Sequence, residues 1–453
     1  MSGTPRVAGL AAIAAFGLML GNAPAAMPRP QAAGGAQDAA GQSKQPYTMA
    51  EYNSEQACAQ EKNPATQITC LNDFVSKYPN SALLIYVYPM YLKAYGDTKN
   101  YAKVIEYSQK VVDLGDKVDP GIRYQALYAH CFAYNALTQA QQADATQSKG
   151  AIQAATDGLK TLEQVKKPDN MSEDQFAAQK KQIQVYFNGT AAQAAMNTKD
   201  YQTAIQFYKA VLTLVPDEPG TNYNLGKVYL ALTPPQPIDA MWYVARAVGS
   251  KSATQLQVKQ LTPYLNKLIQ NYQGGTVCDS ITDAEQKELL QLAGSSADRP
   301  SSYTLPSAAD LDAARKEMTI ASVVADLKAG GDKSKVTWMA SCGLEFPGVP
   351  GKVIEVAPGA SDTDPIDFKI AFVTSDAEFD AATTPNMEVK VAGQPEAKRV
   401  EKDGAVHFTA TLVSYDPDPN FMLHWEKGKI ADEDIPKEKS APKKTTKKKP
   451  SGR

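Results

Sequence analysis

The sequence predicts a mainly α-helical protein, in which antiparallel helix pairs stack into a solenoid and a small antiparallel β-barrel or sandwich follows. Two observations support this prediction. From about Met49 to Gly274, apolar side chains recur at helical spacing in segments that end at proline or glycine. Beyond Lys352, apolar and polar residues alternate instead, which is the period of half-buried strands.

Residues 1–26 have the composition of a signal peptide. Arg6 is the only charge before an apolar run from Val7 to Leu20, and Ala23–Ala26 offers small residues for cleavage. The run is shorter than the ~20 residues that a membrane-spanning helix needs. We therefore expect a periplasmic or secreted mature chain without a transmembrane segment. Residues 27–48 are rich in Ala, Gly, Gln and Pro and are expected to form a flexible linker.

Residues 49–274 are expected to form a helical repeat domain of five helix pairs and a capping helix. One pair cannot bury its own apolar face, so neighbouring pairs must stack and a last helix must cover the end. The expected pairs are 49–62 with 65–77, 82–96 with 100–114, 121–140 with 149–165, 172–196 with 200–215, and 220–232 with 237–248, capped by 256–272.

The array resembles tetratricopeptide (TPR) repeat proteins, most clearly over residues 197–248. In addition, residues 51–64 and 74–81 resemble the corresponding stretches of secreted TPR proteins of acidobacteria. The resemblance covers about half of the chain and implies a non-enzymatic scaffold that holds a protein or peptide partner. The residues at matching repeat positions are Tyr201, Ala204, Tyr208, Leu225, Gly226, Tyr229, Ala240 and Ala247.

In TPR proteins the first helix of each pair lines the groove that holds the partner. A tyrosine there offers a flat apolar face with a hydroxyl group, and a lysine offers positive charge for a peptide carboxylate. Alignment to the repeat places six side chains in the expected groove: Tyr86, Lys93, His130, Gln193, Tyr223 and Lys227.

Residues 275–343 are predicted to be a linker that carries helices near 283–292 and over 308–327. A β-domain over 344–431 should follow, and parts of it resemble the small OB-like barrel that some of these secreted proteins carry. Because its aromatic residues alternate inward and the body of the chain is acidic, no nucleic-acid ligand is expected. The expected strands lie at 352–356, 366–372, 387–391, 406–412 and 421–425.

Residues 432–453 are predicted to form a disordered, Lys-rich tail. The tail could contact anionic envelope material, or it could simply keep the chain soluble. The first possibility opens an alternative function, in which the β-domain and the tail bind envelope polysaccharide or cell wall and the helical array spaces them. The lysines concerned are Lys443, Lys444, Lys447, Lys448 and Lys449.

Five cysteines in an oxidising compartment leave at least one unpaired. Cys58 and Cys70 lie at similar distances from the Asn63-Pro64 turn between two predicted antiparallel helices. The sequence therefore leaves two alternatives for these residues, a Cys58–Cys70 disulfide or two buried thiols. The remaining cysteines, Cys131, Cys278 and Cys342, have no spacing that suggests pairing or metal binding.

The sequence predicts no catalytic residue, metal site or cofactor, so we do not expect an enzyme. The three histidines, His130, His407 and His424, do not have the spacing of metal ligands. His130 is not part of a sequence motif typical of a catalytic triad, and no glycine-rich phosphate loop occurs.

Overall fold

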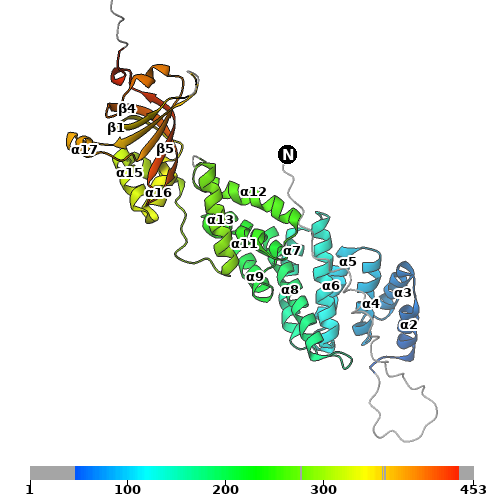
Figure 1. Ribbon diagram of the computed structural model, residues 1–453. Coiled ribbons are helices and arrows are strands. Elements are labelled where there is room, and N and C mark those ends of the chain that lie inside the picture. The colour runs from blue at the N-terminus through cyan, green and yellow to red at the C-terminus, as the bar shows by residue number, and fades with distance from the viewer. Residues whose placement is uncertain (1–45, 276–277, 360, 362–363, 438–453) are drawn as a thin grey trace, which may run out of the picture. The chain divides into compact units, whose positions relative to one another are not determined.

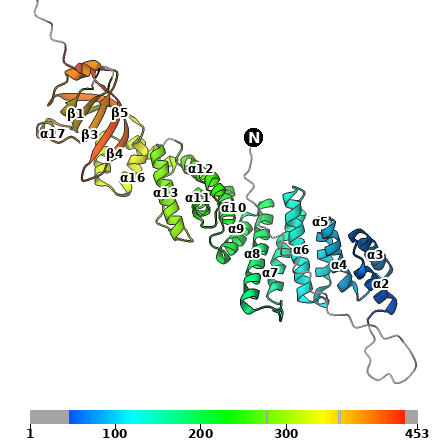
Figure 2. The same cartoon turned by 45° about the vertical axis from the view of Figure 1, so that its right-hand side comes forward.

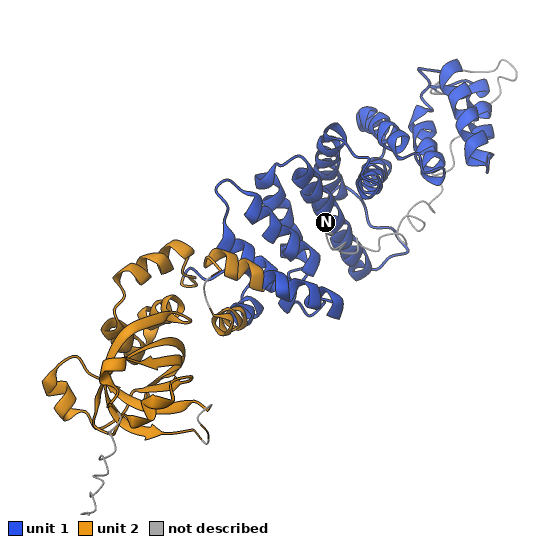
Figure 3. Ribbon diagram, turned by 90° about the horizontal axis from the view of Figure 1, so that it is seen from above, with its two compact units in different colours: residues 1–265, 289–301 blue, residues 266–288, 302–453 orange. Residues whose placement is uncertain are grey.

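The computed structural model describes residues 46–275, 278–359, 361 and 364–437. It divides the chain into two compact units, which Figure 3 colours separately. Unit 1 comprises the chain up to Leu265 together with residues 289–301, and unit 2 comprises residues 266–288 and the chain from Ser302 onward. The predicted signal peptide, nearly all of the predicted linker at 27–48, and residues 438–453 of the predicted tail lie outside the described residues. The last of these segments includes the five lysines from Lys443 to Lys449.

Unit 1 is a stack of antiparallel helix pairs, which confirms the predicted fold class for this part of the chain (Figure 1). From α2 to α11, each helix packs against the next one, and α4 also contacts α6, as α6 contacts α8 (Figure 2). The helices are α2 (Met49–Gln60), α3 (Pro64–Lys77), α4 (Leu84–Asp97), α5 (Tyr101–Asp113), α6 (Pro120–Gln139), α7 (Ala145–Leu162), α8 (Glu173–Asn197), α9 (Tyr201–Leu214), α10 (Pro219–Ala231) and α11 (Pro237–Gly249), followed by α12 (Gln255–Tyr272).

In the second, third and fourth pairs, the same backbone turn connects the first helix to the second. Lys99, Gln141 and Lys199 each occupy the left-handed region, with φ of 56°, 58° and 60°. After Lys199, the Asp200 N–H donates to the Ala195 carbonyl at 2.9 Å, and equivalent bonds close the other two turns. This turn satisfies carbonyls at the end of the first helix and reverses the chain into the second. The repeat is therefore visible in the backbone as well as in the side chains.

The fifth pair depends on a close approach between α10 and α11. A Cβ atom added at Gly226 would lie 2.9 Å from both the Ala240 carbonyl oxygen and Val244 Cγ2. Neither the backbone nor the branched side chain can yield easily, so only glycine fits here. The Leu-Gly element predicted from the repeat pattern thus has a direct packing role.

Unit 2 contains a closed five-stranded barrel with strand order β1-β2-β3-β5-β4. Neighbouring strands are antiparallel except for β3 and β5, which run parallel. The predicted small β-barrel is confirmed, and its one parallel pair among the described strands arises because β4 lies beside β1 and β5 returns between β4 and β3. The strands are β1 (Glu345–Ala357), β2 (Ile366–Phe372), β3 (Met387–Val391), β4 (Ala405–Asp416) and β5 (Met422–Ile430).

The barrel core follows the predicted alternation. Along β4, Val406, Phe408, Ala410 and Leu412 are buried, whereas the residues between them are exposed or half-buried. Trp425 fills the centre, where its ring meets Phe346 and Phe408 edge-on at 5.5 and 5.8 Å between centroids.

In the sequence, four described helices separate the last helix of the array from the first strand of the barrel, where a linker with helices was predicted. The single helix expected over 308–327 is two helices, because Met318 leaves the helical conformation and Thr319 starts a new helix with a capping box to Ser322. The second of these helices belongs to the barrel, since its Val323 and Leu327 join the barrel core. The helices are α13 (Asp279–Ser295), α14 (Ala308–Glu317), α15 (Ile320–Ala329) and α16 (Gly331–Ser341).

Two disulfides hold the two units internally. Cys58 and Cys70, the pair singled out from the sequence, join α2 to α3 with their Cα atoms 5.4 Å apart. Cys278 and Cys342 join the start of α13 to the end of α16, a pairing that the sequence did not suggest. Cys131 is a free, buried thiol.

We predict that Lys199→Gly raises the free energy of unfolding of unit 1 by about 0.5–1 kcal/mol, because glycine accepts the left-handed conformation that lysine adopts only with strain. Urea denaturation followed by circular dichroism measures the change. Lys209→Gly, on the exposed face of α9, is the matched control and should lower stability by about 1 kcal/mol. Equal losses in both variants would contradict the argument.

We also predict that Gly226→Ala lowers the stability of unit 1 by about 1 kcal/mol or more, because overpacking outweighs the gain in helix propensity. The control is Gly189→Ala in α8, where an added Cβ meets nothing within 4 Å. That variant should be neutral or stabilised in the same denaturation experiment. If Gly226→Ala is also neutral, the close approach of α10 and α11 is not a constraint.

Candidate functional site

Two of the six predicted groove residues lie together at the end of the helical array. Lys227 Nζ lies 5.6 Å from the ring centroid of Tyr223, one turn earlier on α10. The Tyr223 ring in turn meets Tyr264 of α12 edge-on, at 6.0 Å between centroids. We call Tyr223, Lys227 and Tyr264 the Tyr223 patch.

The Tyr223 patch combines aromatic surface with a cation that is free to bind. All three side chains are half-buried, so they are fixed in place and still reach solvent. Lys227 forms no ion pair with any described residue. Burial raises the pKa of Tyr223, and burial together with the nearby Tyr223 raises the pKa of Tyr264, so both hydroxyls remain protonated donors.

The patch could not be predicted completely from the sequence. Tyr264 was missed because α12 was predicted only as a cap, without regard to which of its side chains would face α10. The capping helix must pack on the last pair, so some of its side chains must face that pair. An aromatic residue at the helical spacing of this contact face is the sequence signal that could have identified Tyr264.

Three other predicted groove residues lie apart from the patch and have local partners. Lys93 is exposed and paired with Asp97 at 2.5 Å. The Gln193 side-chain amide donates to Asn197 Oδ1 at 3.1 Å. Tyr86 is half-buried against the apolar cluster of the first two helix pairs. These residues therefore do not form one continuous site with Tyr223 and Lys227.

The prediction that His130 lines the groove is wrong. Its side chain is 5% exposed and lies between α5, α6 and α7, with Nδ1 3.0 Å from Ser108 Oγ and Nε2 next to Gly150. Nε2 has no hydrogen-bond partner among the described residues. Burial lowers the pKa of His130 to about 4, so the ring is neutral at pH 7. His130 is a core residue in a position where the repeat alignment expected surface.

The other two histidines lie on the barrel and pair with carboxylates. His407 Nδ1 is 3.0 Å from Asp434 Oδ2 on the exposed face of β4. His424 lies between Glu388 at 2.7 Å and Asp416 at 3.0 Å. Burial works to lower the pKa of His424, but the hydrogen bonds to Asp416 and Glu388 outweigh it and raise the pKa. No nucleophile lies among these contacts.

Neither a metal centre nor a membrane span emerges from the part of the chain that the structure describes. There, no three His, Cys, Asp or Glu side chains gather in a way that could hold a metal ion. Within the same residues, none of the helices combines the length and the apolar character that crossing a bilayer requires.

Comparison with known proteins does not identify a family for this chain. No protein-family model matches the sequence, and no curated protein matches it. Among solved structures, the chain is similar to the TPR2AB domain of yeast Sti1 in its complex with pHSP90, at 12% identity over 55% of this chain and 98% of that chain. The TM-score is 0.20, which is too low to carry an argument. The fold assignment therefore rests on the helix pairs themselves.

We predict that His130 makes the stability of unit 1 depend on pH. A histidine whose folded pKa is lowered contributes stability that is present above its unfolded pKa of about 6.5 and is lost as the pH falls toward 4. We expect a loss of about 3 kcal/mol from this group between pH 7 and pH 4. Urea unfolding at a series of pH values measures it.

His130→Gln is the matched variant, because glutamine can still hydrogen-bond to Ser108 but does not titrate. The stability difference between wild type and variant should shrink as the pH falls, while all other titrating groups cancel in the comparison. A difference that stays constant from pH 7 to pH 4 would show that His130 is not held neutral by burial.

Proposed function

We propose that this protein is a non-enzymatic, extracytoplasmic scaffold of the TPR type that binds a protein or peptide partner through the Tyr223 patch. The observation that carries the proposal is the grouping of an unpaired lysine with two fixed aromatic rings on α10 and α12. Tyrosine and cation side chains in partly desolvated positions are the usual anchors of protein interfaces.

The chemistry of the patch favours a partner segment that bears a carboxylate beside an apolar side chain. Lys227 supplies a positive charge that no described carboxylate neutralises, unlike Lys93, which Asp97 already neutralises. The Tyr223 and Tyr264 rings offer an apolar surface, and their hydroxyls remain donors. A carboxylate bound to Lys227 would place the neighbouring side chain of the partner over these rings.

Two features support an extracytoplasmic location. The start of the sequence has the composition of a signal peptide. In addition, the Cys58–Cys70 and Cys278–Cys342 disulfides are of a kind that persists in oxidising compartments and is rare in the cytosol. We propose the periplasm or the cell exterior, and a role in envelope organisation.

The strand order of the barrel and its parallel β3–β5 pair support an OB-like assignment of unit 2. In this proposal the barrel makes a second contact, to which the lysines at 443–449 add affinity for anionic envelope material. These lysines lie outside the described residues, so this part rests on charge alone.

The test is capture of partners from the native envelope fraction on the immobilised mature protein. We expect a protein partner to bind wild type and to lose at least about tenfold in affinity for Tyr223→Ala/Lys227→Ala, since two anchor side chains are removed. Titration of the captured partner against each variant, followed by fluorescence anisotropy, gives the affinities.

Tyr86→Ala/Lys93→Ala is the matched control, because it removes the same two side-chain types from another first helix, where the lysine is already paired. It should bind the partner as wild type does. The proposal fails if no protein is enriched, or if both double variants retain the same set of proteins.

A further inference from the structure

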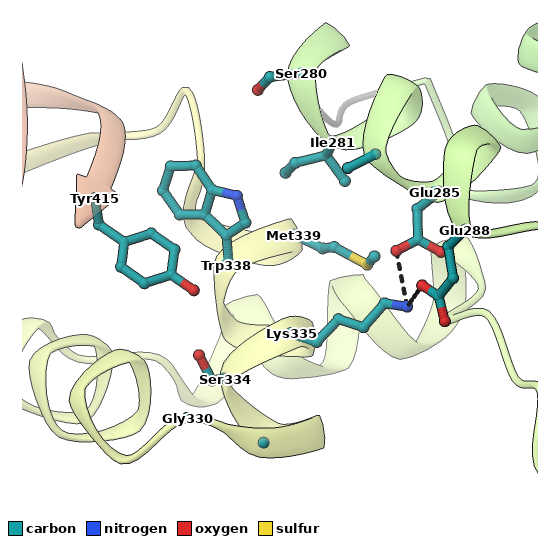
Figure 4. A pocket seen from close by; sticks show the side chains of 12 residues that line it. Ser280, Ile281, Glu285, Glu288, Gly330, Ser334, Lys335, Trp338, Met339 and Tyr415 are labelled. Carbon is teal, nitrogen blue, oxygen red and sulfur yellow. Dashed lines mark hydrogen bonds and ion pairs between the residues drawn. The ribbon is translucent and has the colours of Figure 1, made fainter. Parts of the chain in front are cut away.

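Unit 2 contains a cleft whose lining residues do not belong to the Tyr223 patch. It has an open volume of about 410 Å³ and lies between the first turns of α13, helix α16 and the end of β4 (Figure 4). Ile281 and Met339 form an apolar floor, while Glu285, Lys335, Trp338 and Tyr415 supply the polar and aromatic walls. The cleft therefore has the mixture of apolar lining and few convergent polar groups that is typical of binding sites.

One side of the cleft is charged and consists of Lys335 paired with both Glu285 and Glu288. We call these three residues the triad. Lys335 Nζ lies 2.8 Å from Glu285 Oε1 and 2.9 Å from Glu288 Oε2 (Figure 4). The second oxygen of Glu285 is buried and has no hydrogen-bond partner, and no described residue binds the second oxygen of Glu288. Two carboxylates against one ammonium leave a surplus negative charge when both are ionised.

Glu285 is the unusual member of the triad, because its residue is only 4% exposed. Burial works to raise the pKa of Glu285, and the hydrogen bond from Lys335 offsets this only in part. A buried carboxylate with an unpartnered oxygen is costly to the folded state. A cation bound in the cleft would reduce this cost through charge attraction, without direct contact to the buried oxygen.

The opposite wall is aromatic. The Trp338 indole meets the Tyr415 ring edge-on at 5.0 Å between centroids, and both side chains are half-buried. Neither the indole N–H nor the phenol O–H hydrogen-bonds to any described residue. An indole face is the strongest aromatic partner for a cation, and the two free donors could bind the carbonyls of a bound chain.

The walls of the cleft are held in place before any ligand arrives. The Cys278–Cys342 disulfide joins the residue before α13 to the residue after α16, and Lys335 links the two helices again through Glu285 and Glu288. Trp338 also packs against the barrel core. Such preorganisation reduces the entropy that a ligand loses on binding.

We propose that this cleft binds a cationic side chain, a guanidinium or a primary ammonium, carried on a peptide. The cation lies over Trp338, where the surplus negative charge of Glu285 and Glu288 attracts it, while the neighbouring backbone of the peptide bonds to Trp338 and Tyr415. An anionic ligand is disfavoured by the two carboxylates. This site is separate from the Tyr223 patch and does not depend on the proposed function.

The test uses the full chain and the capped tripeptide Ac-Gly-Arg-Gly-NH2, with the citrulline peptide as its uncharged isostere. Of the three tryptophans, Trp242 and Trp425 are fully buried, so the intrinsic fluorescence change reports on Trp338. We expect saturable binding of the arginine peptide with a Kd below about 1 mM and affinity for the citrulline peptide at least about tenfold weaker.

Two cleft variants and one control complete the design. Glu288→Gln and Trp338→Leu should each weaken arginine-peptide binding about threefold to tenfold, with calorimetry replacing fluorescence for Trp338→Leu. Glu433→Gln removes the same charge from an exposed position in η3 (Asp432–Asp434) and should leave the affinity unchanged. Melting curves show whether each variant folds.

Three results would overturn the proposal. The first is absence of arginine-peptide binding at millimolar concentration by the folded wild type. The second is unchanged affinity in Glu288→Gln. The third is preferential binding of a neutral oligosaccharide such as chitotriose at Trp338, which would make the cleft a glycan site. Tyr223→Ala/Lys227→Ala should bind the arginine peptide normally, so failure here and failure of the proposed scaffold function remain distinguishable.

Discussion

Close contact between neighbouring helices is the constraint on which the array depends. Gly226 lets α10 approach α11 within one pair, and Gly158 lets α7 lie beneath the Phe187 ring of α8, between two pairs. A Cβ atom at either position would meet atoms closer than 3.0 Å. Packing within a helix pair and packing between pairs therefore both depend on glycine. Tyr223 lies one turn before Gly226, so the orientation of the candidate binding surface follows from the same contact.

Unit 2 is held together by a different kind of contact. Its strands close on themselves, so no strand edge is left unpaired, and α15 extends the barrel core with Val323 and Leu327. Trp338 of α16 packs on that core from one side and faces the cleft from the other. The cleft is consequently an extension of the barrel core, and its aromatic wall cannot move without disturbing the barrel.

Local periodicity was enough to predict most elements, and contacts between distant segments account for what it missed. Helix α9 and strand β4 lie within a few residues of their predicted bounds, because side-chain spacing alone defines them. The Cys278–Cys342 pair spans 64 residues, and no local pattern reports such a distance. His130 was predicted to lie on the surface because the repeat alignment predicts the helix but not its rotation about its own axis. The third pair is irregular, so this rotation differs from the repeat pattern. The cleft combines three segments and has no signature in any one of them.

The Cys278–Cys342 disulfide has a consequence for how the two units are connected. The chain passes between the units three times, at residues 265/266, 288/289 and 301/302. The last two crossings lie inside the loop that the disulfide closes. A single break of the backbone within residues 289–301 therefore leaves one covalent molecule, in which both units remain tethered. After such a cut, the part before it separates from the part after it only if the disulfide is reduced or the backbone is broken again outside residues 278–342. In an oxidising environment this connection therefore tolerates proteolytic nicking within residues 289–301.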